Sequence, residues 1–128
     1  MRPSAETRDT IFKAFGRAFF RQDLDAMYAV VTPDFTWSVP DGAVTRVLQG
    51  REQIAAFFVE RRGKIENVRF EDVVYHHAPD ATFMTFRMTG TEVANGQSFE
   101  RIGIERYTFR DGKLAVKDVY NRPTDPVG

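Results

Sequence analysis

Two carboxyl groups have a setting in the sequence that suits acid–base chemistry. Glu105 lies within a long run of β-forming residues, and Asp41 lies in the segment Pro40-Asp41-Gly42. A carboxyl group buried among apolar side chains without a compensating cation has a raised pKa, which suits a general acid or base. We therefore take Glu105 and Asp41 as candidate catalytic residues. Two other interpretations stay open, because Glu105 can belong to a buried ion pair and Asp41 can be an ordinary turn residue.

Two neighbouring histidines, His76 and His77, are the residues most suited to holding a metal ion. Adjacent residues of a strand point to opposite faces, so the two rings cannot share one ion unless a bulge intervenes. The sequence contains no glycine-rich phosphate loop, no nucleophile elbow and no cysteine. We expect no metal site and no cofactor.

Three arginines on expected strands, Arg87, Arg101 and Arg106, have the charge to bind an acidic ligand. Arginines on a sheet also pair across strands with carboxylates such as Glu92 and Glu100. Both roles remain open at this point.

The charge balance excludes several classes of partner. The chain of 128 residues has 18 basic and 18 acidic residues, and its longest basic cluster is the pair Arg61-Arg62. A surface that follows a phosphate backbone is therefore not expected, so we predict no nucleic-acid partner. The first ten residues form no apolar leader and no segment is long enough to span a membrane, so we expect no membrane partner and a cytoplasmic protein.

Hydrophobic spacings of three and four predict helices in the first half of the chain. Residues 5–21 carry one apolar stripe, Asp23 can cap a shorter helix that ends before Pro33, and residues 50–63 repeat the helical spacing between two glycines. These elements can position Glu105 only if strands bring it against their apolar faces.

The second half of the chain follows the period of two that is typical of strands. Asn95-Gly96 and Asp111-Gly112 are strong hairpin signals between these runs. The strands are expected near 35–39, 44–48, 66–77, 81–93, 98–109 and 113–121. This order predicts one α+β domain over residues 1–128, in which three helices pack inside a curved, mostly antiparallel sheet.

Three segments resemble a known group of proteins. These are GREQIAAFF at 50–58, the loop DGAVTRVLQG at 41–50 and the hairpin ANGQ at 94–97. Together with the order of elements, they resemble the ketosteroid isomerase and SnoaL-like branch of the nuclear transport factor 2-like superfamily. The resemblance implies a cone-shaped, cystatin-like α+β barrel and, because members of this fold differ in chemistry, no particular reaction.

The resemblance also implies positions for known catalytic groups. The general base of the isomerases would fall at Val39, their tyrosine donor at Phe15 and their neutral carboxylic acid at Glu105. The Arg-x-Asp pair of the similar epoxide hydrolases would read Arg87-Met88-Thr89, and their last-strand aspartate would read Val119. Ketosteroid isomerase activity is therefore not expected here.

Strand register predicts the face on which Glu105 lies. A two-residue turn at Asn95-Gly96 places Glu105 opposite Phe86, which belongs to an apolar row that should face the helices. The next turn leaves two alternatives: a bulged loop places Glu105 opposite Lys117, and a two-residue turn places it opposite Asp118. We favour the bulged loop and an inward Glu105.

These expectations combine into a functional hypothesis. We expect a pocket for a small hydrophobic or amphipathic molecule and, if there is turnover, a cofactor-free isomerisation, cyclisation or hydrolysis by proton transfer. The alternative is a ligand-binding or structural dimer module without turnover. A homodimer is expected through an apolar outer face of the sheet at Ile102, Ile104, Val116 and Tyr120. The expected ligand-contacting residues are Phe15, Phe19, Trp37, Val39, Phe57, Phe86, Met88, Arg101 and Asn121.

Overall fold

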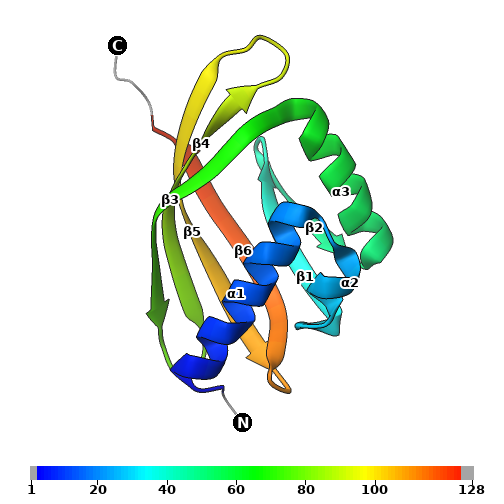
Figure 1. Cartoon of the computed structure of the whole chain (residues 1–128), viewed down its shortest axis with the longest axis vertical. Coiled ribbons are helices and arrows are strands. Elements are labelled where there is room, and N and C mark those ends of the chain that lie inside the picture. The colour runs from blue at the N-terminus through cyan, green and yellow to red at the C-terminus, as the bar shows by residue number, and fades with distance from the viewer. Residues whose placement is uncertain (1–2, 125–128) are drawn as a thin grey trace.

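A six-stranded sheet curves around three helices in the computed structural model of the chain, which describes residues 3–124 (Figure 1). The helices are α1 (Ala5–Arg21), α2 (Leu24–Tyr28) and α3 (Arg51–Lys64). The strands are β1 (Val31–Asp41), β2 (Val44–Gln49), β3 (Ile65–His77), β4 (Thr82–Glu92), β5 (Ser98–Arg110) and β6 (Lys113–Pro123). Within this range no helix is both long enough and apolar enough to cross a membrane.

The strand order is β2-β1-β6-β5-β4-β3, and only the β1–β6 pair is parallel. Strands β3 to β6 form the expected antiparallel meander. Because β2 and β3 are the two edge strands and do not pair with each other, the curved sheet stays open and does not close into a barrel. The α+β fold predicted from the sequence is confirmed.

Local sequence signals explain the helix ends. The Ser4 hydroxyl accepts a hydrogen bond from Thr7 N at 3.2 Å, and Asp23 caps α2 by accepting from Ala26 N at 3.1 Å. The third helix runs one residue beyond the predicted end at Gly63. The first strand is longer than the predicted 35–39 and contains Pro40, which lies beyond the last β1–β6 pair at Ser38 and therefore interrupts no hydrogen bond to β6.

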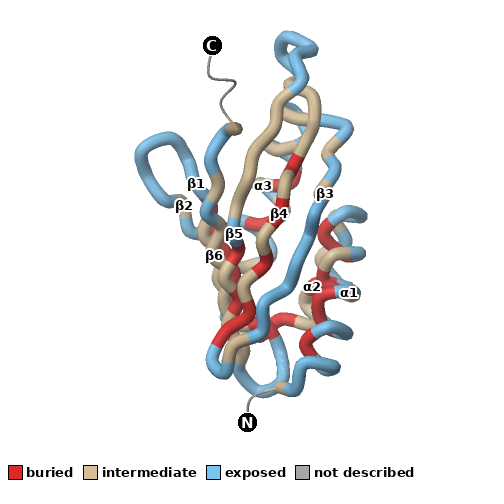
Figure 2. The backbone as a smooth tube through the Cα atoms, turned by 90° about the vertical axis from the view of Figure 1, so that its left-hand side faces the viewer, coloured by how far each residue is buried: buried red, intermediate tan, exposed pale blue. Residues whose placement is uncertain are grey.

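The apolar face of α1 and the inner face of the sheet form the core. Figure 2 shows buried positions along α1 and β4 and exposed positions along much of β3. Three phenylalanines of α1 pack against aromatic rings of β1 and β5. The pairs are Phe12 with Tyr107, Phe15 with Phe35 and Phe19 with Trp37, so this helix covers the inner face of the sheet.

Both predicted hairpin registers are wrong, although the predicted faces are right. The β4–β5 loop has four residues, Val93 to Gly96, because Glu92 N donates to Gln97 O at 2.8 Å. Glu105 therefore lies opposite Met84 and not Phe86. A register shift of two residues leaves every side chain on its original face, so Glu105 still points inward.

The β5–β6 hairpin differs from both predicted alternatives. Asp111-Gly112 forms a two-residue turn in which both residues have positive φ, and the register then shifts by one residue before Val116. Glu105 consequently lies opposite Val119, instead of Lys117 or Asp118. Because of the extra residue, Lys117 lies on the same face of β6 as the bulged loop predicted. This is the inner face of the sheet, on which Glu105 also lies.

Candidate functional site

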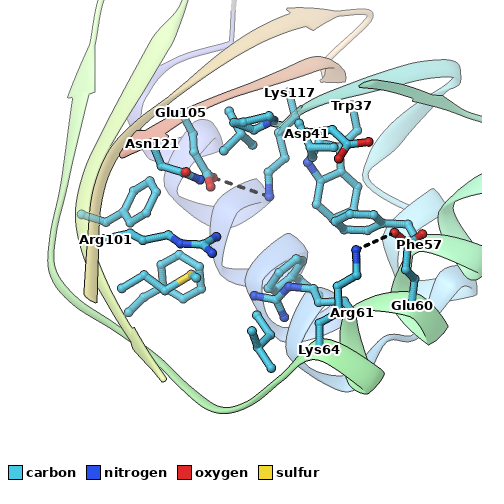
Figure 3. Close-up of a pocket in the computed structure, with 18 of the residues that line it drawn as sticks. Trp37, Asp41, Phe57, Glu60, Arg61, Lys64, Arg101, Glu105, Lys117 and Asn121 are labelled. Atoms are coloured by element: carbon cyan, nitrogen blue, oxygen red, sulfur yellow. Dashed lines mark hydrogen bonds and ion pairs between the residues drawn. The ribbon is translucent and has the colours of Figure 1, made fainter. Parts of the chain in front are cut away.

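A cavity of about 470 Å³ lies between α3 and the inner face of the sheet (Figure 3). All the predicted catalytic and ligand-contacting residues line it except Phe15. They are Phe19, Trp37, Val39, Asp41, Phe57, Phe86, Met88, Arg101, Glu105 and Asn121. The structure therefore brings together side chains from α1, α3, β1, β4, β5 and β6.

Phe15 lies beside the cavity instead of lining it. Its ring packs edge-on against Phe35 and Tyr107, and Lys117 Nζ lies 5.0 Å from its centroid. It borders a smaller hollow of about 120 Å³ that also reaches Glu105 and Lys117. Its place is therefore in the core behind the charged residues.

Glu105 and Lys117 form a buried ion pair at the inner end of the cavity. Lys117 Nζ lies 3.5 Å from Glu105 Oε1, and each residue is only 4% exposed. The Tyr107 hydroxyl donates a hydrogen bond to the same Oε1 atom. Both contacts use one carboxylate oxygen, so Oε2 has no protein partner within residues 3–124 and is available to a ligand.

The electrostatics of this cluster follow from burial. Burial lowers the pKa of Lys117, the negative charge of Glu105 opposes that change, and the charge of Arg61 adds to it. Burial and the neighbouring Glu105 carboxylate raise the pKa of Tyr107 well above its ordinary value. Tyr107 therefore keeps its proton at neutral pH and acts as a hydrogen-bond donor.

Aromatic rings surround the Lys117 ammonium group. Nζ lies 4.4 Å from the Trp37 ring and 4.7 Å from the Phe19 ring. Cation–π contacts of this kind are stronger in a desolvated site than on a surface, so the rings help to stabilise the buried cation.

Two guanidinium groups also extend into the cavity, Arg61 from α3 and Arg101 from β5 (Figure 3). Arg61 lies over the Phe19 ring at 5.0 Å, and Arg101 lies over the Phe99 ring at 5.1 Å. Neither makes an ion pair with a carboxylate in the described part of the chain.

The mouth of the cavity carries further charges. Asp41 is exposed at the end of β1, directly before Gly42 with its φ of 63°. Glu60 pairs with Arg46 at 2.9 Å and with Lys64 at 3.1 Å. These groups lie at the rim, and Figure 3 shows Lys64 and Glu60 together at the end of α3.

The other chemical candidates lie outside the cavity. Arg87 pairs with three carboxylates, Glu71, Asp72 and Glu100, and Arg106 lies 4.0 Å from Asp118. His76 Nε2 contacts Thr85 and His77 Nε2 contacts Asp9, so the two rings have separate partners. Among the described residues no group of three metal-ligating side chains is present.

Several residues of the site were not singled out as site residues from the sequence, among them Tyr107, Lys117 and Arg61. Tyr107 shares the inward parity of Glu105 two positions away, and Lys117 was considered only as its ion-pair partner. Arg61 continues the helical spacing of Ile54 and Phe58. Periodicity places such residues inward, but it does not distinguish a cavity wall from a solvated rim.

Three helices packed inside a curved, open sheet agree with the nuclear transport factor 2-like α+β cone fold. The chain belongs to the SnoaL-like domain family, whose family model matches residues 12–117. No curated protein matches the chain.

Solved structures share the same architecture. An NTF2-like protein from Burkholderia xenovorans is 20% identical with a TM-score of 0.81, and the match covers 93% of this chain and 92% of that one. A putative polyketide cyclase from Xanthomonas campestris is 21% identical with a TM-score of 0.75 and 90% coverage of both chains. TerC, co-crystallised with polyporic acid, is 17% identical with a TM-score of 0.76, covering 89% of this chain and 90% of TerC. At these identities the comparisons show the fold alone.

Proposed function

We propose that this chain binds a small amphipathic molecule in the cavity and transfers a proton within it without a cofactor. The observation that carries the proposal is the buried Glu105 carboxylate, which lines a cavity that also has aromatic walls and whose Oε2 atom has no protein partner among the described residues. A filled or uniformly apolar cavity would instead favour a structural role. Neighbours called putative polyketide cyclase and putative isomerase are consistent with such chemistry.

The reaction assigns a separate role to each group. Glu105 Oε2 takes a proton from a carbon next to a carbonyl group, and the electron pair of that C–H bond moves onto the carbonyl oxygen to form an enolate. The nearby cation of Lys117 stabilises the developing negative charge, since a fixed charge in a water-poor site interacts strongly. Tyr107 holds the carboxylate in place. When the enolate is conjugated with a C=C bond, return of the proton from Glu105 to the far carbon of that bond completes an isomerisation. When the enolate carbon attacks a second carbonyl, transfer of the proton from Glu105 to the resulting alkoxide completes a cyclisation.

A hydrogen-exchange experiment tests this proposal. The probe is 2-tetralone, an apolar bicyclic ketone with acidic C–H groups, in heavy water. Wild-type protein is expected to accelerate deuterium incorporation over buffer by roughly 10² to 10⁴-fold, as measured by NMR. Glu105→Gln should abolish the acceleration. Glu100→Gln is the matched control, because Glu100 lies on the same strand with opposite parity and pairs with Arg87.

A second candidate is a ligand-binding module without turnover. It is favoured by Val39 and Phe15, which occupy the positions where the resemblance places the base and the donor of the isomerases. Binding of 2-tetralone without any exchange above the buffer rate would support this candidate and contradict proton transfer.

A further inference from the structure

The carboxylates and the cations that line the cavity differ in how many have a partner of opposite charge. Glu105 and Glu60 already pair with lysine or arginine, and Glu92 accepts a hydrogen bond from Asn95 at 2.9 Å. Asp41 is exposed at the rim. Within residues 3–124, every carboxylate deep in the cavity thus already has a cationic or hydrogen-bonding partner.

Arg61 and Arg101 are the cations left without such a partner. Among residues 3–124, their charged groups form no ion pair and lie over aromatic ring faces, which stabilise a cation less than a bidentate carboxylate does. Arg61 and Arg101 are both half-buried, so water screens their charges less than at an open surface. Two guanidinium groups in this setting favour an anion that is supplied from outside the chain.

Repulsion between Arg61 and Arg101 also favours binding of an anion. Burial lowers the pKa of Arg61, and the positive charge of Arg101 lowers it further, whereas the Glu105 carboxylate acts in the opposite direction. The two arginines therefore sense each other's charge. An anion bound near both would relieve this repulsion, and the planar guanidinium group matches the two oxygens of a carboxylate.

Aromatic rings in the cavity walls can contact the apolar part of a ligand. Trp37 and Phe57 pack edge to face at 5.2 Å, and Phe70 and Phe86 pack at the same distance on the sheet side. We propose that the cavity binds a small aromatic or alicyclic carboxylic acid, with its carboxylate at Arg61 and Arg101 and its ring against Trp37 and Phe57. This inference rests on the proposed function only in using the same cavity.

Calorimetric titration of a matched pair of probes tests the inference. The probes are 2-naphthoate and its neutral counterpart 2-naphthamide, which share one ring system and differ in charge. Wild-type protein is expected to bind naphthoate at least about 10-fold more tightly than the amide, because hydrogen bonds to charged groups are stronger than neutral ones.

Charge-matched variants locate the carboxylate. Arg61→Gln and Arg101→Gln should each weaken naphthoate binding at least about 10-fold and leave amide binding nearly unchanged. Arg62→Gln and Arg106→Gln remove the same charge from the next residue of α3 and from the outer face of β5, and they should leave both affinities unchanged. Arg101→Lys, which keeps the charge, should show an intermediate loss. Circular dichroism checks that each variant is folded.

The outcomes separate this inference from the proton-transfer proposal. Equal affinities for acid and amide, no detectable naphthoate binding, or a loss in the control variants as large as in Arg61→Gln and Arg101→Gln would overturn the carboxylate site. In each of those cases, exchange of 2-tetralone that depends on Glu105 would still support proton transfer. Selective naphthoate binding without exchange would support the carboxylate site alone.

Discussion

At the residue scale, the ion pair between Glu105 and Lys117 is the feature with the largest expected effect on stability. Glu105→Gln keeps the shape of the side chain but leaves a buried ammonium group without its counter-charge, so we expect it to lower the free energy of unfolding by about 3 to 5 kcal/mol. Lys117→Met should be similarly destabilising because it leaves the carboxylate unpaired. Urea denaturation measures both changes.

The double variant Glu105→Gln/Lys117→Met is the control for that prediction. It removes both charges, so its loss of stability should be smaller than the sum of the two single losses, with a coupling energy of about 0.5 to 3 kcal/mol. Additive losses would mean that the two side chains do not depend on each other in the folded protein.

The pH dependence of stability should report the burial of Lys117. Its pKa in the folded protein lies below the ordinary value of 10.5, so in the window between the two values the unfolded chain binds more protons than the folded one. The free energy of unfolding of the wild type, relative to the double variant, should therefore rise with pH within that window, up to about pH 10. A flat or falling difference in urea denaturation would contradict a depressed pKa. Ionisation of Tyr107 limits the window at high pH, because its raised pKa makes stability fall above the ordinary value of 10.0.

At the scale of the elements, a glycine on β5 keeps the cavity wall in place. A Cβ atom at Gly103 would lie 2.5 Å from Phe86 Cζ and 2.7 Å from the carbonyl oxygen of Tyr120. Gly103→Ala must displace backbone as well as a ring, so we expect a loss of about 1 to 3 kcal/mol in the free energy of unfolding. The matched control is Gly16→Ala within α1, where a Cβ atom meets nothing within 4 Å. Thermal and urea denaturation should show a gain of about 0.5 to 1 kcal/mol for the control, and a stable Gly103→Ala variant would contradict the close packing.

Bulges shape the longest strands and were not predicted. Asn67 and Asp72 of β3 both have a φ of 55°, and the β3–β4 register shifts beside each of them. Asparagine and aspartate tolerate this left-handed conformation better than other side chains do, and each bulge bends its strand. The bends allow β3 to follow the curve of the sheet around α1.

At the scale of the whole molecule, the outer face of the sheet is the surface most suited to association. Ile104 and Tyr120 pair across β5 and β6 and are 45% and 62% exposed. They adjoin a shallow hollow that includes Ile102 and Arg122. We propose that a second copy of the chain covers this face, because an exposed apolar sheet face is usually a contact surface.

Light scattering tests the dimer. At micromolar concentration the wild type should have roughly twice the chain mass of 14.7 kDa, and Tyr120→Asp should shift it toward the monomer. Val59→Asp is the control, since Val59 is an exposed apolar residue on α3, away from the sheet. A wild type that scatters only as a monomer would rule out this interface.

The sequence by itself determined the type and order of the elements and the inward face of Glu105. Helical spacing identified α1 and α3, and the period of two placed Glu105 inward despite a wrong register, because a shift of two residues preserves parity. The face of Lys117 depended on the choice between the two loops after β5. These signals are local, so a single sequence contains them.

Only the tertiary structure decided which inward residues meet and which remain unpaired. The four-residue loop at Val93 to Gly96 and the bulge before Val116 set the strand partners of Glu105, and the resulting geometry brings the Tyr107 hydroxyl to Oε1. The approach of α3 to β5 places Arg61 and Arg101 in one cavity, whereas Phe15 lies behind its wall. Such contacts join positions far apart in the chain, and they depend on loop lengths and bulges that hydrophobic periodicity does not encode.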